Sequence, residues 1–415
     1  MNVKTFVKKY TMVIALVVVF IIFSLLTDGR LLYPQNLSNL LLQNAYVLVL
    51  SCGMLLCILT GGNVDLSIGS TVCLAGAIGA QMLSKTGIPA FFVILICIIT
   101  GIVIGFWQGF WIGYIHIPPF ICTLSGMFLF RGLARVILDS KTVSIKNQFF
   151  LNLFANYIQI PGLDSPTVEE PNFLVKGLHA FRNFLLPLIG QDPEEKLFIS
   201  AAIFGVIIAI LLIVLTVIGR IKKSRMGYSQ EHVAAEFGKI IVIAVLIVIY
   251  SWKLANYKGI PNMLLWVLAV VLIYAFITSR TAFGRYFYAV GGNEKATKLS
   301  GIDTRRVYFM AYASMSFLAA LSAMLVAARV GSVNGDTGTS FEMDAIGACF
   351  IGGASAYGGS GTVPGIMIGA ILLGVINQGM SIIGLDNNWQ YVVKGGVLLT
   401  AVIFDVVSNH KTGKA

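Results

Sequence analysis

Long apolar runs, separated by short polar stretches, recur along the whole chain. Each run approaches the roughly 20 residues that a helix needs to cross a bilayer. In lipid the backbone must satisfy its own hydrogen bonds, so such runs form helices rather than open sheet. The weak alternating pattern of a membrane β-barrel is absent. The pattern therefore predicts an all-α, polytopic transmembrane bundle. Its clearest runs are Thr11–Thr27, Leu40–Thr60, Pro89–Tyr114, Leu197–Gly219, Pro261–Ser279, Val307–Ala328 and Trp389–Val407.

The apolar runs predict about 10–12 spans in four regions. Residues 1–139 form N-terminal transmembrane helices, and residues 140–196 form a polar, proline-broken external segment. Residues 197–256 add a helical pair with a cytoplasmic loop, and residues 257–415 hold the C-terminal helices and the loop 280–306. Spans are expected at about 11–27, 37–60, 66–85, 89–115, 118–139, 197–219, 240–256, 261–279, 307–329, 343–358, 361–384 and 389–408.

The basic residues indicate how the chain is oriented. The chain has 29 Lys and Arg residues against 18 Asp and Glu, and 16 of the basic residues fall in the segments expected on the cytoplasmic side. This matches the positive-inside rule for a multi-pass protein whose N- and C-termini are both cytoplasmic. No basic groove with interleaved aromatic residues is present, so nucleic acid is not expected as a partner.

No enzyme chemistry is predicted. The chain has no G-x-x-x-x-G-K-[ST] phosphate loop, and its four histidines are scattered, so we expect no catalytic residue, no metal site and no cofactor bound by this chain. The six cysteines lie in apolar segments, where they are expected to be packing residues rather than a disulfide framework.

The polar stretch Gly291–Ile302 predicts a short helix in a basic, cytoplasmic loop. Asn293 can cap its start, and Glu294 suits the positive end of its dipole. Ala296 and Leu299 share one face, and Gly301 supplies a stop. Such a helix is a plausible contact surface for a soluble partner, and an ordinary loop helix is the alternative.

Two glycine-rich stretches interrupt the apolar pattern, at Thr60–Ser70 and at Glu342–Gly361. Broken helices of this kind expose polar groups toward a cavity and form substrate paths in transporters. The alternative is that the glycines let helices pack closely, with Asp65 or Ser67 as a helix cap. The helix-break glycines are Gly61, Gly62, Gly352, Gly353, Gly358 and Gly359.

Polar residues inside apolar runs are the candidates for a translocation path, because their burial in lipid is costly. Those in the first break are Asn63, Asp65 and Ser67. Asn377 and Gln378 lie near the middle of a later span, where they could bind a hydroxylated solute or join helices. Lys394 lies near the outer end of the last span and is expected at the interface.

Four stretches resemble the membrane permeases of bacterial ABC-type monosaccharide importers, the family of ribose, xylose and galactose permeases. The long outer segment and the extra pair of helices look most like the multiple-sugar or xylose subgroup. The stretches are GGNVDLSIGS (61–70), FGRYFYAVGGNEKATKLSGI (283–302), FEMDAIGACFIGGASAYGGSGTVPGIMIGAILLGVINQGMSIIG (341–384) and WQYVVKGGVLLTAVIFDV (389–406).

The resemblance implies a transmembrane permease subunit in the bacterial cell membrane, not an enzyme. It would move monosaccharides such as xylose, arabinose, glucose or galactose by alternating access. A separate ABC ATPase would bind ATP and Mg²⁺. A second permease chain, an extracytoplasmic sugar-binding protein and membrane lipid would be its other partners, and specificity would reside largely in the binding protein. An ion-coupled secondary sugar carrier is the alternative function.

The resemblance also assigns the short loop helix as the ATPase-coupling helix. Where the family commonly has two successive alanines, this chain has Ala296 and Thr297. We expect the side chain of Thr297 to face solvent. The coupling residues are Asn293, Glu294, Lys295, Ala296, Thr297, Lys298, Leu299, Ser300 and Gly301.

Overall fold

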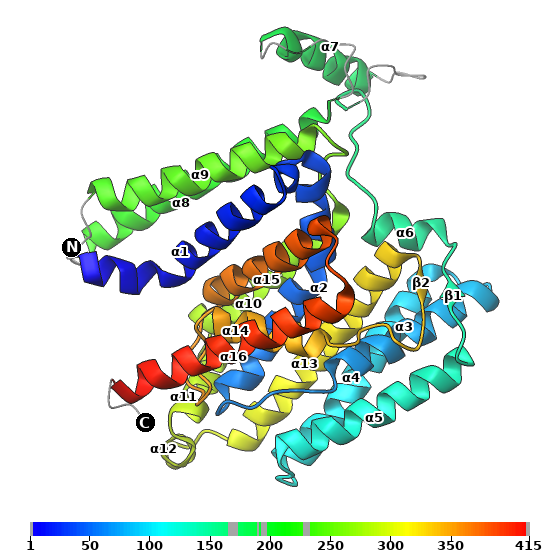
Figure 1. Ribbon diagram of the computed structural model, residues 1–415, viewed down its shortest axis with the longest axis vertical. Coiled ribbons are helices and arrows are strands. Elements are labelled where there is room, and N and C mark those ends of the chain that lie inside the picture. The colour runs from blue at the N-terminus through cyan, green and yellow to red at the C-terminus, as the bar shows by residue number, and fades with distance from the viewer. Residues whose placement is uncertain (1–2, 165–172, 189–190, 192–196, 227–232, 412–415) are drawn as a thin grey trace. The chain divides into compact units, whose positions relative to one another are not determined.

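The structure is a computed structural model that describes residues 3–164, 173–188, 191, 197–226 and 233–411 (Figure 1). The chain divides into two compact units. Unit 1 comprises residues 1–31, 40–155 and 263–415, and unit 2 comprises residues 32–39 and 156–262. The division of the chain into four regions stays a prediction.

Unit 1 is built almost entirely of helices. Two short strands, β1 (Val143–Ser144) and β2 (Ser332–Val333), pair antiparallel, with Val143 opposite Val333. Its helices are α1 (Val3–Leu26), most of α2 (Pro34–Leu59), α3 (Ile68–Lys85), α4 (Ala90–Gly113), α5 (Pro119–Leu138), α6 (Gln148–Phe154), α10 (Asn262–Arg280), α11 (Ala282–Gly292), α12 (Glu294–Leu299), α13 (Thr304–Val330), α14 (Phe341–Ile351), α15 (Val363–Ile383) and α16 (Asn387–Lys411).

Helix α13 forms the core of unit 1, where it packs against α3 and α4, and most of its residues are buried. Four glycines spaced four residues apart on α4 allow this close packing. A Cβ added at Gly105 would lie 2.7 Å from the Cα of Ala313, and one at Gly101 would lie 2.5 Å from the Cβ of Ala320. Gly109 and Gly113 approach Phe309 and Arg305 in the same way. Small residues at this spacing bring helix backbones together where the hydrophobic effect cannot, because lipid is itself apolar.

Unit 2 contains α7 (Phe173–Leu188), α8 (Ile199–Arg225) and α9 (Val233–Ala255). Helices α8 and α9 pack along each other, and Gly205 of α8 faces the Ser251 side chain of α9. A backbone hydrogen bond from Ile158 N to Ile260 O (2.8 Å) joins the two ends of the long segment. The start of α2 is tied to this unit, since the Tyr250 hydroxyl donates to the carbonyl of Leu37 (2.8 Å).

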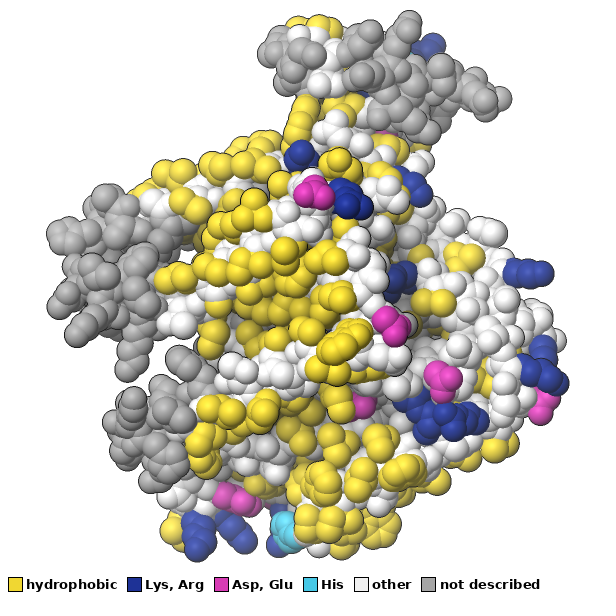
Figure 2. Space-filling model, viewed as in Figure 1, with side chains coloured by type: hydrophobic (Ala, Val, Ile, Leu, Met, Phe, Trp, Pro, Cys, Tyr) yellow, Lys and Arg dark blue, Asp and Glu magenta, His cyan; other side chains and the backbone are white. Residues whose placement is uncertain are grey.

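The predicted polytopic helical bundle is confirmed. Within the described residues, seven helices are long and apolar enough to cross a membrane: α2, α4, α5, α8, α10, α13 and α15. Two shorter apolar helical stretches lie at Thr11–Leu26 and Ile240–Ala255. Exposed hydrophobic side chains cover much of the visible face (Figure 2), as expected for surfaces that contact lipid. All six cysteines are free and buried.

The predicted span at 343–358 is wrong. Helix α14 ends at Ile351, and residues 352–362 turn back before α15 begins at Val363. Eleven residues measure about 17 Å, well short of the ~30 Å hydrocarbon core. The glycines after Ile351 stop the helix, and α14 is therefore a half-length helix inside the bundle.

Candidate functional site

The predicted loop helix is present as α12, and its caps are confirmed. The side-chain Oδ1 of Asn293 accepts a hydrogen bond from Ala296 N (3.0 Å), and Glu294 occupies the first turn. Gly301 adopts a positive φ of 82° just after the last turn, where a left-handed residue ends a helix at little cost. The hydroxyl of Tyr308, in the first turns of α13, donates to Glu294 Oε2 (3.1 Å).

Helix α12 presents an exposed surface with one correction to the predicted faces. Thr297, expected to face solvent, is buried, and its hydroxyl donates to the carbonyl of Asn293 (2.8 Å). Leu299 is 90% exposed, and Ala296 is also exposed.

The two predicted helix breaks meet each other in space. Gly359 N donates to the carbonyl of Leu59 (3.1 Å), so the turn after α14 contacts the end of α2. A Cβ on Gly62 would lie 1.9 Å from the carbonyl oxygen of Ala356, and one on Gly358 would lie 2.5 Å from the Cα of Gly61. Only glycine permits backbones to approach so closely.

The same contact includes the end of α11. A Cβ on Gly291 would lie 1.8 Å from the carbonyl oxygen of Leu59 and 2.5 Å from Gly359 N. We call this meeting of Leu59–Gly62, Ala356–Gly359 and Gly291 the glycine junction. Since α12 begins at Glu294, this helix starts three residues after a direct backbone contact with both helix breaks. Gly352 and Gly353 lie at the end of α14, where Gly352 packs on Ile366 of α15.

Asp65 and Ser67 form a buried polar cluster beside this junction. Asp65 Oδ1 accepts hydrogen bonds from Ser67 N (2.8 Å) and Ser67 Oγ (2.7 Å). The Ser67 hydroxyl in turn accepts from Gln108 Nε2 of α4 (2.5 Å), and Ser316 of α13 donates weakly to Gln108 Oε1 (3.5 Å). Ser67 occupies the N-cap position of α3 but its side chain makes no capping bond, so its proposed capping role is wrong. Its hydroxyl instead joins α3 to α4. Asn63 is partly buried and bonds the carbonyl of Thr60 (3.0 Å).

A polar cavity of about 430 Å³ lies at the opposite end of α13 from α12. Helix α13 has 27 residues, so these two features are separated by about 40 Å along its axis. The cavity is lined by residues of α2, α13, α14, α15 and α16 and of the segment between α13 and α14: Leu40, Gln43, Asn44, Tyr46, Val326, Arg329, Val330, Asn334, Thr337, Gly338, Phe341, Gly374, Asn377, Ser381, Gln390 and Lys394.

A buried ion pair lies beside this cavity. Lys394 Nζ is 3.0 Å from Asp344 Oδ1, and the Tyr46 hydroxyl donates to Asp344 Oδ2 (2.6 Å). The side chains of Lys394 and Asp344 are 18% and 3% exposed, so Lys394 makes a largely buried ion pair near the start of α16, and its interfacial position stays a prediction. The sequence could not reveal the pairing, because the two residues lie 50 positions apart on different helices.

The structure separates the two amides of α15. Asn377 lines the polar cavity, whereas Gln378 is buried outside it. Neither the Oδ1 of Asn377 nor the Oε1 of Gln378 has a hydrogen-bond partner among the described residues. Sequence reasoning missed Arg329, which lines the cavity at the last turn of α13 and is exposed there. An arginine directly after a long apolar run was the available signal.

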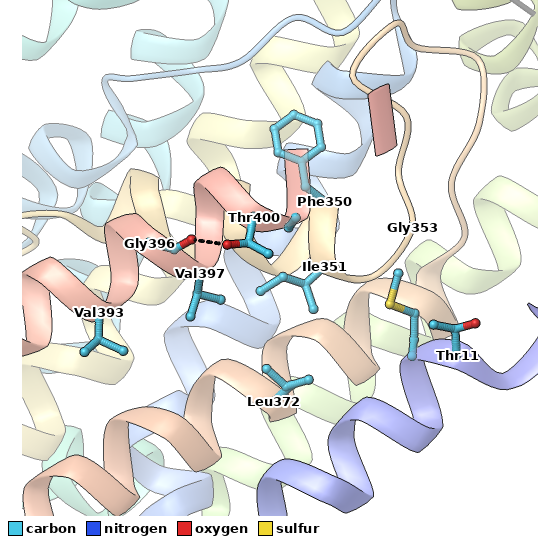
Figure 3. A pocket seen from close by; sticks show the side chains of 11 residues that line it. Thr11, Phe350, Ile351, Gly353, Leu372, Val393, Gly396, Val397 and Thr400 are labelled. Atoms are coloured by element: carbon cyan, nitrogen blue, oxygen red, sulfur yellow. Dashed lines mark hydrogen bonds between the residues drawn. The ribbon is translucent and has the colours of Figure 1, made fainter. Parts of the chain in front are cut away.

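A second, larger cavity of about 640 Å³ is apolar (Figure 3). Side chains of α1, α14, α15 and α16 line it, among them Ile351, Leu372, Val393 and Val397. The hydroxyl of Thr400 is satisfied by the carbonyl of Gly396 in its own helix (2.8 Å). This lining offers few groups to a hydroxylated solute and suits acyl chains or apolar side chains better.

Comparisons with known proteins match nearly the whole chain. Residues 36–163 and 180–402 match the family described as branched-chain amino acid transport system / permease component. The xylose transport system permease protein of Haemophilus influenzae is 32% identical over 402 residues, covering 97% of each chain. The protein of the same name from Escherichia coli K12 is 30% identical over 403 residues, covering 97% of this chain and 93% of its own. The galactose/methyl galactoside import permease protein of Escherichia coli K12 is 28% identical over 412 residues, covering 97% of this chain and 95% of its own. No solved structure matches.

Proposed function

The chain belongs to the permease family of ABC-type monosaccharide importers, within the branched-chain amino acid transport permease components, and from this premise we propose that it carries monosaccharides inward across the cell membrane. Its relatives are named for xylose and for galactose and methyl galactoside. The substrate of this chain would be a sugar of that size, such as xylose, arabinose, glucose or galactose. A separate ATPase subunit would supply the energy, since no phosphate loop is present in the sequence.

One observation carries the proposal: the exposed, capped helix α12 follows directly on the glycine junction. A partner that pushes α12 would move α11, and α11 touches both helix breaks through Gly291. A rigid helix can transmit such a movement, because packed interfaces switch between discrete arrangements rather than deform continuously. The glycine junction would thus connect a separate ATPase subunit to the half-length helix α14.

The basic residues around α12 support a cytoplasmic position for this loop. In that orientation the polar cavity, at the other end of α13, would lie toward the extracytoplasmic side, and both termini of the chain would be cytoplasmic. A soluble sugar-binding protein would then deliver its ligand above the cavity. Movement of the α2 and α14 breaks would open the path alternately to each side. A second copy of this chain would complete the pathway.

Reconstitution tests this function directly. Proteoliposomes containing the permease, its ATPase and its binding protein should accumulate radiolabelled xylose or galactose only when ATP is supplied to the ATPase. An ion-coupled carrier, the less favoured alternative, requires no ATPase and would stop when a proton or sodium gradient is collapsed. Accumulation of sugar by the lone chain in a gradient, without nucleotide, would refute the importer.

A further inference from the structure

We propose that the polar cavity is itself a binding site for a neutral monosaccharide, so that the permease takes part in choosing the sugar. This inference rests on the proposed function and goes beyond it, because a simple conduit needs no recognition groups. The cavity is lined by residues of α2, α13, α14, α15 and α16 and of the segment before α14, and all of these lining residues belong to unit 1. Its volume of about 430 Å³ falls within the range of ~300–1,000 Å³ typical of small-molecule pockets.

Two aromatic rings form one wall of the cavity. The rings of Tyr46 and Phe341 stack with their centroids 3.7 Å apart and their planes 17° apart, and both residues line the cavity. A pyranose has an apolar face of C–H groups, which packs on an aromatic face, and a polar rim of hydroxyls. Tyr46 is fixed in place because its hydroxyl bonds Asp344, and Asp344 is held by Lys394. The wall is therefore preorganised, which lowers the cost of binding.

Two polar residues at the cavity, Arg329 and Asn377, have groups without partners among the described residues. Each sugar hydroxyl both donates and accepts, so a sugar site needs amides or charged donors around the ring. Arg329 lines the cavity and makes no hydrogen bond or ion pair to any residue that the structure describes. Asn377 also lines the cavity, and its buried Oδ1 has no hydrogen-bond partner among the described residues. Gln43 and Gln390 add further amides to the lining.

The charges at the cavity nearly balance. Asp344 pairs with Lys394, so these two formal charges cancel, and Arg329 is the single unpaired charge among the described residues that line the cavity. A site for an anion would be expected to hold two free cations. One guanidinium and several amides are instead suited to hydrogen bonds with hydroxyl groups. A neutral sugar thus fits the cavity better than a sugar phosphate. The apolar cavity of Figure 3 has no comparable set of groups.

The test uses the whole importer in lipid nanodiscs or proteoliposomes. Uptake of D-xylose, D-ribose and D-galactose is compared for the natural chain, for Asn377→Leu and for Thr400→Val. Thr400 lies in the apolar cavity and satisfies its hydroxyl within its own helix, so its variant controls for the loss of a polar group in the bundle. We expect Asn377→Leu to slow uptake of the preferred sugar at least tenfold and to change the ranking of the three sugars. ATP hydrolysis stimulated by the loaded binding protein should persist.

A binding measurement separates recognition from passage. Saturation-transfer NMR with D-xylose and the permease in nanodiscs, without binding protein, should show contact for the natural chain and a loss of contact for Asn377→Leu. Phe341→Leu, which removes a ring but keeps an apolar side chain, should weaken the signal in the same way. Equal slowing of all three sugars, or no signal from the natural chain, would overturn the inference. Failure of the natural importer to accumulate any sugar with ATP would instead overturn the proposed function.

Discussion

The glycine junction makes a sharp prediction for Gly291→Ala. The added methyl would lie 1.8 Å from the carbonyl oxygen of Leu59, whereas ordinary contacts of a Cβ begin near 3.4 Å. The backbones of α11 and α2 would therefore have to separate by about 1.5 Å. Overpacking of this kind costs about 1–3 kcal/mol, and more where backbone rather than a flexible side chain must give way.

The neighbouring glycine supplies a matched control. A Cβ on Gly292 meets no atom within 4 Å, so Gly292→Ala makes the same chemical change on the same helix without a clash. Gly292 is exposed, and its replacement leaves the junction intact. Any effect specific to Gly291→Ala is then due to the contact with Leu59 and Gly359.

The assay measures sugar transported per ATP hydrolysed, together with the melting temperature of the purified permease. A cost of about 1.4 kcal/mol shifts a two-state balance tenfold, so we expect Gly291→Ala to lower the transport-to-hydrolysis ratio fivefold or more and to lower the melting temperature. Gly292→Ala should match the natural chain in both. If the two variants behave alike, the junction does not link the coupling helix to the helix breaks.

The remaining predictions address the coupling surface, the ion pair and the helix packing. Ala296→Asp should uncouple ATP hydrolysis from sugar uptake while membrane assembly persists, because Ala296 is exposed on α12; normal uptake by this variant in proteoliposomes would contradict the coupling role. Lys394→Met should destabilise the fold by about 3–5 kcal/mol, since it leaves Asp344 as an unpaired buried charge, and adding Asp344→Asn should restore part of the loss in thermal unfolding. Gly105→Leu should disrupt the packing of α4 on α13 and reduce the yield of folded permease in size-exclusion chromatography, whereas Gly132→Leu, at a position where an added Cβ meets nothing within 4 Å, should not.

The secondary structure was largely readable from local patterns. Apolar runs located the long helices, and Asn293 and Gly301 located the limits of α12, because capping depends only on residues three or four positions away. Gly61 and Gly62 correctly marked the interruption between α2 and α3, and Gly352 and Gly353 marked the one between α14 and α15. The expected span at 343–358 failed because hydropathy does not distinguish a half-length buried helix from a crossing one.

The candidate site was only partly predictable. Asn377, Asp65 and Ser67 were singled out as candidates for a translocation path, a role that stays a prediction, and their grouping in space was not foreseen. Asn377 belongs to the polar cavity, whereas Asp65 and Ser67 belong to a buried cluster with Gln108. Thr297 was placed on the wrong face, because its burial depends on packing against neighbouring elements rather than on its position in a six-residue helix.

The sequence by itself determined that this chain is a bundle of membrane helices with two glycine breaks and a capped basic loop. Those properties follow from hydrophobicity, backbone hydrogen bonding and capping, all of which are local. Only the tertiary structure decided that the breaks at Gly62 and Gly358 touch each other and Gly291, and that Lys394 reaches Asp344 beside the polar cavity. Contacts between residues tens or hundreds of positions apart depend on how helices pack, and no local pattern specifies that packing.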